Sequence, residues 1–384
     1  MVPVTSLYVH VPFCRRKCGY CAFVSEPVQP ERVTRYLAEL ERELELIAGD
    51  LRPQTVYFGG GTPTVLTLAQ WERLLAAWRR LGLLEAGEWT VECNPATFTR
   101  ETMRWLRDQG VNRVSLGVQC FEDQLLQRLG RPHNRAMALE AWAGLRQAGF
   151  DNLNLDLMFA IPGQTLAGWE ATLAEALALG SEHLSCYEVT YEEDTPLFRQ
   201  LAAGQVPVDQ DLACDMYEAL VARSADAGLE LYEVSNFARN PGDGPGEFPS
   251  RACRHNLNYW RGGDYYGIGP AATSYVRGVR SRNYSDLDRY EACLQQGRRP
   301  IESSERLEPL ARAGELAAFG LRLRAGWPFD LFQERTGFDL RREWANEIQQ
   351  LIALEYGCLE GDRFRLTASG LRFADWVAEQ FLRP

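Results

Sequence analysis

The chain has 384 residues, of which 46% are hydrophobic and 24% charged, a composition typical of a folded globular protein rather than a disordered one. Its formal net charge of -11 argues against a nucleic-acid-binding surface, because phosphate backbones require a basic one. No apolar run approaches the roughly 20 residues needed to span a bilayer, and the N-terminus lacks a signal-peptide pattern. We therefore expect a cytoplasmic protein with reduced cysteines.

Strand and helix patterns alternate through the first half of the chain. Short β-branched or aromatic runs predict strands at 6–11, 54–58, 89–92, 113–118, 153–158 and 183–189. Apolar residues at three- and four-residue steps predict helices at 31–48, 68–82, 100–109, 135–148 and 165–179. Six successive βα units imply parallel strands with right-handed crossovers, so we expect an α/β fold with a partial (β/α)6 barrel of the TIM type.

The chain changes character after about residue 237. We expect the barrel to occupy residues 1–237, followed at 238–304 by a linker that begins with a Gly/Pro-rich loop and continues into a segment rich in aromatic residues and Asn. Residues 305–384 read as helices around a short strand and turn. They predict a small α-rich domain of the winged-helix type, which the acidic charge argues against reading as DNA-binding.

Polar and glycine-rich segments follow the predicted strands. They are GGGTP (59–63), ECNP (92–95), VQCFE (118–122) and FAIPGQT (159–165). The C-terminal ends of parallel barrel strands gather on one rim, where α/β barrels carry their chemistry. These segments are therefore expected to meet at one site.

Three cysteines follow the first strand, with the spacing C-x3-C-x2-C at Cys14, Cys18 and Cys21. Three thiolates leave one iron of a [4Fe–4S] cluster without a protein ligand, which opens a position for an external chelator. The alternative is a zinc site completed by His10 or a distant cysteine, although zinc sites prefer paired C-x2-C halves.

This cysteine motif, with Tyr20 before its last member, resembles the signature of the radical SAM superfamily, and GGGTP resembles that superfamily's methionine-binding segment. The resemblance implies that S-adenosylmethionine chelates the open iron. An electron from the reduced cluster then cleaves the sulfonium and releases a 5′-deoxyadenosyl radical. The alternative is a barrel in which the cluster has only a structural role.

A narrower resemblance covers about residues 6–380. VYFGGGTPT, LDLMFAIPGQT, EVSNFAR and RHNLNYWRGGDYYGIGP look like the HemN/HemW group, which comprises oxygen-independent coproporphyrinogen III oxidases and heme chaperones. The resemblance implies S-adenosylmethionine contacts at Tyr8, Tyr20, Gly60, Gly61, Thr62, Glu92, Gln119, Arg131 and Asp156, with Thr190 and Thr273 matching by position only.

Two features favour the HemW branch, the heme chaperones. Phe23 stands where the oxidases have a further cysteine, and only a short segment precedes the first strand. His255–Tyr259 matches the H-N-x-x-Y heme motif of HemW, so His255 is the candidate ligand of heme iron, with Cys253 and Tyr259 as the next candidates. Thr273 departs from the family, which usually has His there.

The resemblance thus implies a heme chaperone that holds a [4Fe–4S] cluster and S-adenosylmethionine, binds heme and passes it to an apo-hemoprotein, such as a membrane respiratory enzyme. It further implies an electron donor for the cluster and allows a homodimer. The alternatives are a coproporphyrinogen III oxidase or a radical methyltransferase on the same scaffold. We expect the core to cleave S-adenosylmethionine, with oxidase activity the less favoured reading.

Overall fold

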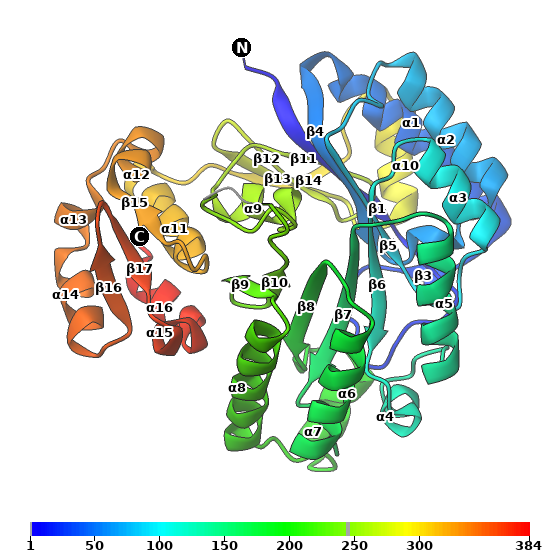
Figure 1. Ribbon diagram of the computed structural model, residues 1–384. Helices are drawn as coiled ribbons and strands as arrows, with labels where there is room; N and C mark the ends of the chain where they lie inside the picture. Colours follow the sequence, from blue (N-terminus) through cyan, green and yellow to red (C-terminus); the bar gives the residue numbers. More distant parts are fainter. Residues whose placement is uncertain (1, 243–245) are drawn as a thin grey trace.

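The computed structural model describes residues 2–242 and 246–384 and is built around a nine-stranded sheet in the order β11-β1-β4-β5-β6-β7-β8-β10-β9 (Figure 1). The neighbouring strands from β11 through β8 run parallel, whereas β10 and β9 are antiparallel. The strands are β1 (Val4–Val11), β4 (Leu51–Gly60), β5 (Glu88–Cys93), β6 (Arg113–Gln119), β7 (Leu153–Phe159), β8 (His183–Glu188), β9 (Glu230–Glu233), β10 (Asn236–Ala238) and β11 (Tyr266–Ile268). All six predicted strands are present, and the α/β fold with a mostly parallel sheet is confirmed.

Helices cover the outer side of this sheet (Figure 1). The five predicted helices form α1 (Pro30–Ile47), α2 (Leu68–Arg80), α3 (Arg100–Asp108), α5 (Arg135–Gln147) and α6 (Leu166–Ala178), and the chain adds α4 (Asp123–Arg128), α7 (Pro196–Ala202) and α8 (Gln210–Asp226). Four of the predicted helices begin at side-chain caps, from Thr67, Thr99, Asn134 and Thr165. Their apolar faces bury large aromatic side chains such as Trp71 and Trp78 against the strands.

The inner side of the sheet is polar. Because successive strand residues point to opposite faces, the alternation in NLNLDL sends its leucines outward to the helices and Asn154 and Asp156 inward. Ser115 on β6 and Ser185 on β8 face the same interior. The barrel therefore encloses polar side chains instead of an apolar core.

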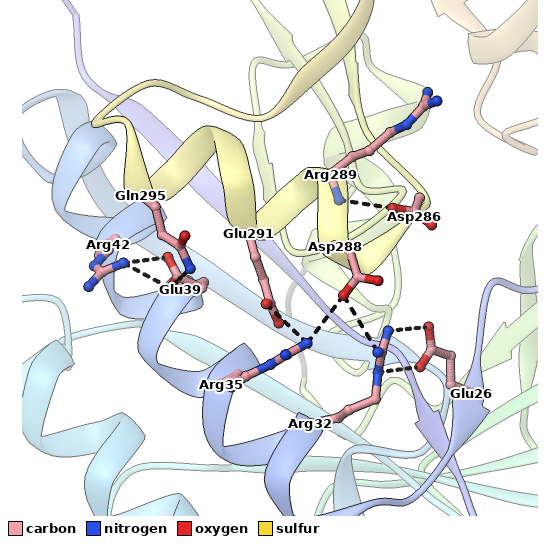
Figure 2. Close-up of polar contacts among 10 residues, drawn as sticks. All are labelled: Glu26, Arg32, Arg35, Glu39, Arg42, Asp286, Asp288, Arg289, Glu291 and Gln295. Atoms are coloured by element: carbon pink, nitrogen blue, oxygen red, sulfur yellow. Dashed lines mark hydrogen bonds and ion pairs between the residues drawn. The ribbon is translucent and has the colours of Figure 1, made fainter.

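The elements that follow residue 246, up to β14, pack closely against the barrel. They are α9 (Arg254–Trp260), β11, the antiparallel sheet of β12 (Thr273–Val276), β13 (Val279–Asn283) and β14 (Ile301–Glu305), and α10 (Leu287–Gln295). Strand β11 pairs with β1 and extends the main sheet. Figure 2 shows α10 held against α1 by ion pairs in which Asp288 contacts Arg32 and Arg35, at 3.5 and 3.2 Å.

The C-terminal part of the chain forms its own core. It consists of α11 (Pro309–Leu321), α12 (Phe329–Thr336), α13 (Leu340–Glu343), α14 (Ala345–Ala353), α15 (Ala368–Arg372) and α16 (Ala374–Phe381) around the sheet β15 (Trp327–Pro328), β17 (Arg363–Leu366) and β16 (Gly357–Glu360). Its core includes Trp327, Phe332 and Trp344. In Figure 1 this helical domain lies beside α9, and Arg261 at the end of α9 donates to the carbonyl of Gly326 at 2.7 Å. No helix within the described ranges has the length and hydropathy of a membrane span.

Candidate functional site

The three motif cysteines lie on a loop that two short parallel strands bracket, β2 (Phe13–Cys14) and β3 (Glu26–Pro27). The loop leaves the end of β1, so it stands at the C-terminal rim of the barrel, as expected. Gly19 in its middle donates its N–H to Leu129 at 2.9 Å and accepts at its carbonyl from Leu197, also at 2.9 Å. The rim segments after β6 and β8 therefore anchor the loop that carries the thiols.

Each thiol meets a different environment. Cys14 Sγ lies 3.4 Å from the hydroxyl of Thr62, and the guanidinium of Arg131 donates to Cys18 Sγ at 3.5 Å. A turn in which the N–H of Cys21 donates to the carbonyl of Cys18 brings these two residues together, and burial raises the pKa of the Cys21 thiol. A guanidinium thus faces Cys18 and a hydroxyl faces Cys14, and a nearby cation favours the thiolate form of a cysteine.

The two metal sites considered from the sequence share the three motif cysteines and differ in whether His10 or a distant cysteine completes the site. None of the ten cysteines, all of which lie in the described ranges, forms a disulfide. Within those ranges no three His, Cys, Asp or Glu side chains converge closely enough to hold one metal ion. His10 is engaged at both ring nitrogens, by Tyr8 at 3.0 Å and by the carbonyl of Val24 at 2.8 Å. Three thiols on one loop match a polynuclear cluster, in which each thiolate binds a different iron.

The GGGTP segment closes against the start of the cysteine loop. The N–H groups of Gly61 and Thr62 donate to the carbonyls of Val11 and Phe13 at 2.9 and 2.8 Å. A Cβ on Gly61 would lie 2.6 Å from the Val11 oxygen, and Gly60 has a φ of +100°, so both positions require glycine. Since these N–H groups hold the loop, a ligand at this segment would meet its carbonyl oxygens and the Thr62 hydroxyl.

Glu92, at the end of β5, joins this segment to the barrel interior. Its carboxylate accepts from the Tyr57 hydroxyl at 2.9 Å and from the N–H of Gly60 at 3.2 Å. Burial, and then the charge of Asp156, raises the pKa of Glu92 to about 7, against its two hydrogen bonds. A carboxylate in this state can accept hydrogen bonds from a hydroxyl-bearing ligand such as a ribose.

The remaining expected S-adenosylmethionine contacts fall in three places. Gln119, with a φ of +70° at a bulge in β6, and Arg131 both direct nitrogens towards Gly117, and Arg131 donates to its carbonyl at 2.6 Å. Asp156 accepts from Ser115 and Asn154 at 2.9 and 2.8 Å, and burial raises its pKa. Tyr20 packs on the rim cluster that contains Leu129, and burial raises the pKa of its phenol.

Thr190 and Thr273, matched by position only, lie apart from each other. Thr190 is exposed, whereas Thr273, on β12, borders the barrel interior together with Tyr8. The structure thus brings Thr273 to the cavity from outside the predicted barrel.

A cavity of about 510 Å³ runs through the barrel interior, a volume typical of small-molecule sites. At its upper end Tyr8, Asp156, Thr273 and the residues that follow Cys21 line it. At its lower end, where the strands begin, helix α9 contributes His255 and Tyr259. Three of the expected S-adenosylmethionine contacts, Tyr8, Asp156 and Thr273, therefore line one cavity with the predicted heme motif, whereas the motif cysteines lie on the rim above that cavity.

His255 is buried and bonded at both ring nitrogens. Thr55 Oγ1 lies 2.9 Å from Nδ1, and Tyr259 Oη lies 2.9 Å from Nε2. Because the Thr55 hydroxyl gives its own proton to Ser6, it accepts the Nδ1 proton of His255, which leaves the Nε2 lone pair to accept from Tyr259. Burial, and then the charge of Arg113, lowers the pKa of His255 to about 3, so its imidazole is neutral. Neutral imidazole with a supported Nδ1 is the form that ligates iron.

The two other heme-ligand candidates are in a less suitable state. Burial is the main cause that raises the pKa of the Cys253 thiol to about 12 and places that of the Tyr259 phenol well above its ordinary value. Both are therefore protonated, whereas heme iron binds thiolate and phenolate. Tyr259 lines the cavity, while Trp260 packs against Phe319 of the C-terminal domain, with ring centroids 6.1 Å apart.

The sequence reasoning did not find the residues that hold α9 in place. Glu88, at the start of β5, accepts from the N–H groups of Arg254 and His255, both at 2.9 Å. Tyr57 stacks on the His255 ring with centroids 5.3 Å apart. Alternation along QTVYF did indicate that Thr55 and Tyr57 share one face, but not which helix that face would meet.

Comparisons with known proteins agree with this geometry. The chain matches the Radical SAM superfamily over residues 8–176 and the HemN C-terminal domain over residues 307–373. It is 32% identical to the heme chaperone HemW of Lactococcus lactis subsp. lactis (strain IL1403), over 98% of this chain and 97% of that protein. The heme chaperone HemW of Escherichia coli (strain K12) is 33% identical over 99% of both chains.

The chain belongs to the HemW family. A solved structure of coproporphyrinogen III oxidase (HemN) from Escherichia coli matches 99% of the chain, and the chain covers 90% of that structure, with a TM-score of 0.84. At 21% identity this likeness shows the shared fold. Membership of the radical SAM superfamily implies a [4Fe–4S] cluster and S-adenosylmethionine, and the three motif cysteines near the end of β1 could supply the three thiolates of such a cluster.

Proposed function

We propose that this HemW-family protein is a heme chaperone, which binds heme in the barrel cavity and passes it to an apo-hemoprotein. The observation that carries the proposal is the state of His255: a neutral, buried imidazole lines the cavity, with Thr55 behind its Nδ1 and a lone pair on Nε2. The near full-length likeness to proteins named heme chaperone HemW supports it. In this reading His255 Nε2 exchanges its hydrogen bond from Tyr259 for the heme iron.

The upper end of the barrel is proposed to hold the two resident cofactors. Cys14, Cys18 and Cys21 would ligate the cluster, and S-adenosylmethionine would bind among Tyr8, Tyr20, the glycine segment, Glu92, Gln119, Arg131 and Asp156. When bound, the pair supplies one-electron cleavage of the sulfonium. The protein's own groups orient the ligands there: Arg131 beside Cys18, Thr62 beside Cys14, and Glu92 fixed by Tyr57.

An electron donor is a further proposed partner. Arg15, Arg16 and Lys17 are exposed on the cysteine loop of a chain with net charge -11, and a small acidic redox protein would complement them. Lys17 is the single lysine in the sequence, so carbodiimide coupling to such a donor has one lysine to use. Peptide mapping of the coupled product should find the cross-link at Lys17, and a product cross-linked only elsewhere would refute this docking surface. A cytoplasmic location, a membrane-enzyme recipient and a homodimer remain proposals alongside it.

The decisive experiment is a heme titration of the anaerobically reconstituted protein, followed by its Soret band. We expect saturable one-to-one binding that weakens at least tenfold in His255→Ala, because the variant removes the ligating nitrogen. His183→Ala is the matched control: His183 lines the same cavity and has both ring nitrogens bonded, to Asn154 and Tyr232. Equal loss in both variants, or no specific binding by the wild type, would contradict the proposal.

The rival function is tested with the same preparation. Anaerobic incubation with coproporphyrinogen III and S-adenosylmethionine yields protoporphyrinogen IX if the chain is an oxidase. We expect none, because the chain has Phe23 where a further cysteine would stand, and Phe23 borders the cavity beside the cysteine loop.

A further inference from the structure

Arg113 is a buried cation for which the described residues supply no direct partner. It opens β6, is 2% exposed, and lines the barrel cavity. Its guanidinium makes no hydrogen bond within the described ranges, where no carboxylate oxygen comes within 4.0 Å of its nitrogens. Arg261, also buried, shows the usual pattern, since it pairs with Glu247 at 2.7 Å and with the Gly326 carbonyl.

The acidic groups near Arg113 are committed elsewhere. Both oxygens of Glu88 accept from backbone N–H groups of α9, and Asp156 accepts from Ser115 and Asn154. Although burial opposes its charge, the nearby Glu88 carboxylate helps to keep the pKa of Arg113 above its ordinary value, so the guanidinium remains charged. A charge buried without a close counter-ion is costly, and a ligand anion would remove that cost.

The kind of anion follows from the shape of the group and the cavity. A guanidinium presents planar, parallel N–H donors that match a carboxylate in a two-bond fork. Arg113 and His255 line the same cavity, and the charge of Arg113 contributes to the lowered pKa of His255, so the two side chains are near neighbours. Heme carries two propionate carboxylates on one edge of its ring, within reach of a cation beside the iron ligand.

We propose that Arg113 binds a propionate carboxylate of heme inside the barrel and thereby positions the macrocycle for His255. The inference rests on the proposed heme-binding function and adds to it the anchor for the polar edge of the ligand. Arg113 is then a binding residue that the strand pattern RVSLGV hides, because it is the first residue of a strand whose other residues read as core.

A chemical double-mutant cycle tests the pairing, with heme and heme dimethyl ester as the probes. Both are titrated into the reconstituted full-length wild type and into Arg113→Gln. We expect the wild type to bind heme about 10- to 100-fold more tightly than the ester, the range for a charge-assisted hydrogen-bonded pair, and Arg113→Gln to lose most of that preference. Arg282→Gln, which changes the other arginine that lines the cavity, should keep it.

The outcomes separate this inference from the function on which it rests. If the wild type does not bind heme, the proposed function fails; if it binds heme but Arg113→Gln still prefers heme over the ester, only the role of Arg113 fails. Should Arg113→Gln not fold, Arg113→Lys keeps the charge without the fork, and an undiminished preference there overturns the proposal.

The methionine carboxylate of S-adenosylmethionine is the other candidate anion. The affinity of the protein for S-adenosylmethionine, measured by anaerobic equilibrium dialysis, should be unchanged in Arg113→Gln. If Arg113→Gln loses affinity for S-adenosylmethionine but not for heme, the assignment of Arg113 to heme is overturned.

Discussion

The upper rim of the barrel, which carries the cysteine loop, and the lower end of its cavity differ in how their polar groups are satisfied. On the cysteine loop, the thiols of Cys14 and Cys18 have, among the described residues, contacts of 3.4 and 3.5 Å to Thr62 and Arg131. At the lower end His255 has two hydrogen bonds of 2.9 Å, and the backbone of α9 has a carboxylate cap from Glu88. The thiols have few partners, whereas the His255 imidazole is fully hydrogen-bonded without a ligand.

This difference suggests different residence times for what each end binds. Groups with weak contacts gain the full interaction with a ligand and lose little, so they suit a cofactor that stays. A ligand at His255 must first displace the Tyr259 hydrogen bond, which lowers the net gain of binding. A cargo that has to be handed on is better served by such a site, because its release restores an internal hydrogen bond.

The largest expected effect concerns the independence of the two ends. Cys18→Ala should reduce bound iron and acid-labile sulfide to background after anaerobic reconstitution, because the cluster loses one of its three protein ligands. Heme affinity, by Soret titration, should stay within about twofold. The control is Cys120→Ala, which removes a fully buried thiol on the loop after β6 and should leave the cluster intact. If Cys18→Ala lost heme binding together with the cluster, the cluster and heme sites would not be independent.

The sequence predicted the upper end far better than the lower end. The cysteine loop and the glycine segment follow strands directly, so local pattern and parallel topology placed them together on one rim. The lower end depends on contacts between distant parts of the chain, such as Glu88 with His255 and β11 with β1. No local pattern specifies that a segment resembling a linker will insert a strand beside β1.

One polar residue of the barrel interior could have been predicted from the sequence but was not. The alternation in NLNLDL marks Asn154 and Asp156 as inward-facing, and only Asp156 was expected at the site. Arg113 gave no such alternation signal, because its strand continues as VSLGV. The cavity that Arg113 lines forms only where α9 covers the starts of the strands. Periodicity identifies which residues share one face of a strand, whereas the segment that packs on that face is set by the tertiary structure.

A second prediction sharpens the comparison through pH. Glu92 has a pKa of about 7 in the folded chain against an ordinary 4.5, so the folded state holds this proton more tightly than the unfolded state. Its contribution to the free energy of unfolding is therefore lost as pH rises from 4.5 to 7 and is constant above that. The difference of 2.5 units corresponds to on the order of 3 kcal/mol.

Glu92→Gln removes this titration and is the matched variant, since its amide is nearly the same size. Urea unfolding of the cluster-free chain under anaerobic conditions, at pH 5 and pH 8, measures the effect. We expect the free energy of unfolding of Glu92→Gln, relative to that of the wild type, to be larger at pH 8 than at pH 5. A difference that stays constant with pH would mean that Glu92 is already ionised at pH 5, and that the upper end is as well satisfied as the lower.

The smallest effect tests the lower end most directly. If heme iron takes His255 Nε2, the Tyr259 hydroxyl competes with it for the same lone pair, and Tyr259→Phe removes the competitor while keeping the ring. A net hydrogen bond is worth about 1 kcal/mol, so heme affinity should rise roughly fivefold, and heme should leave more slowly to apomyoglobin. If the Tyr259 phenolate were itself the iron ligand, the same variant would bind heme more weakly. Tyr265→Phe is the control, because Tyr265 lines the cavity and stacks edge-on with Tyr259, 4.4 Å between centroids. A gain in Tyr259→Phe alone would show that the protein limits its own affinity for heme with an internal hydrogen bond, as a carrier that must release its cargo requires.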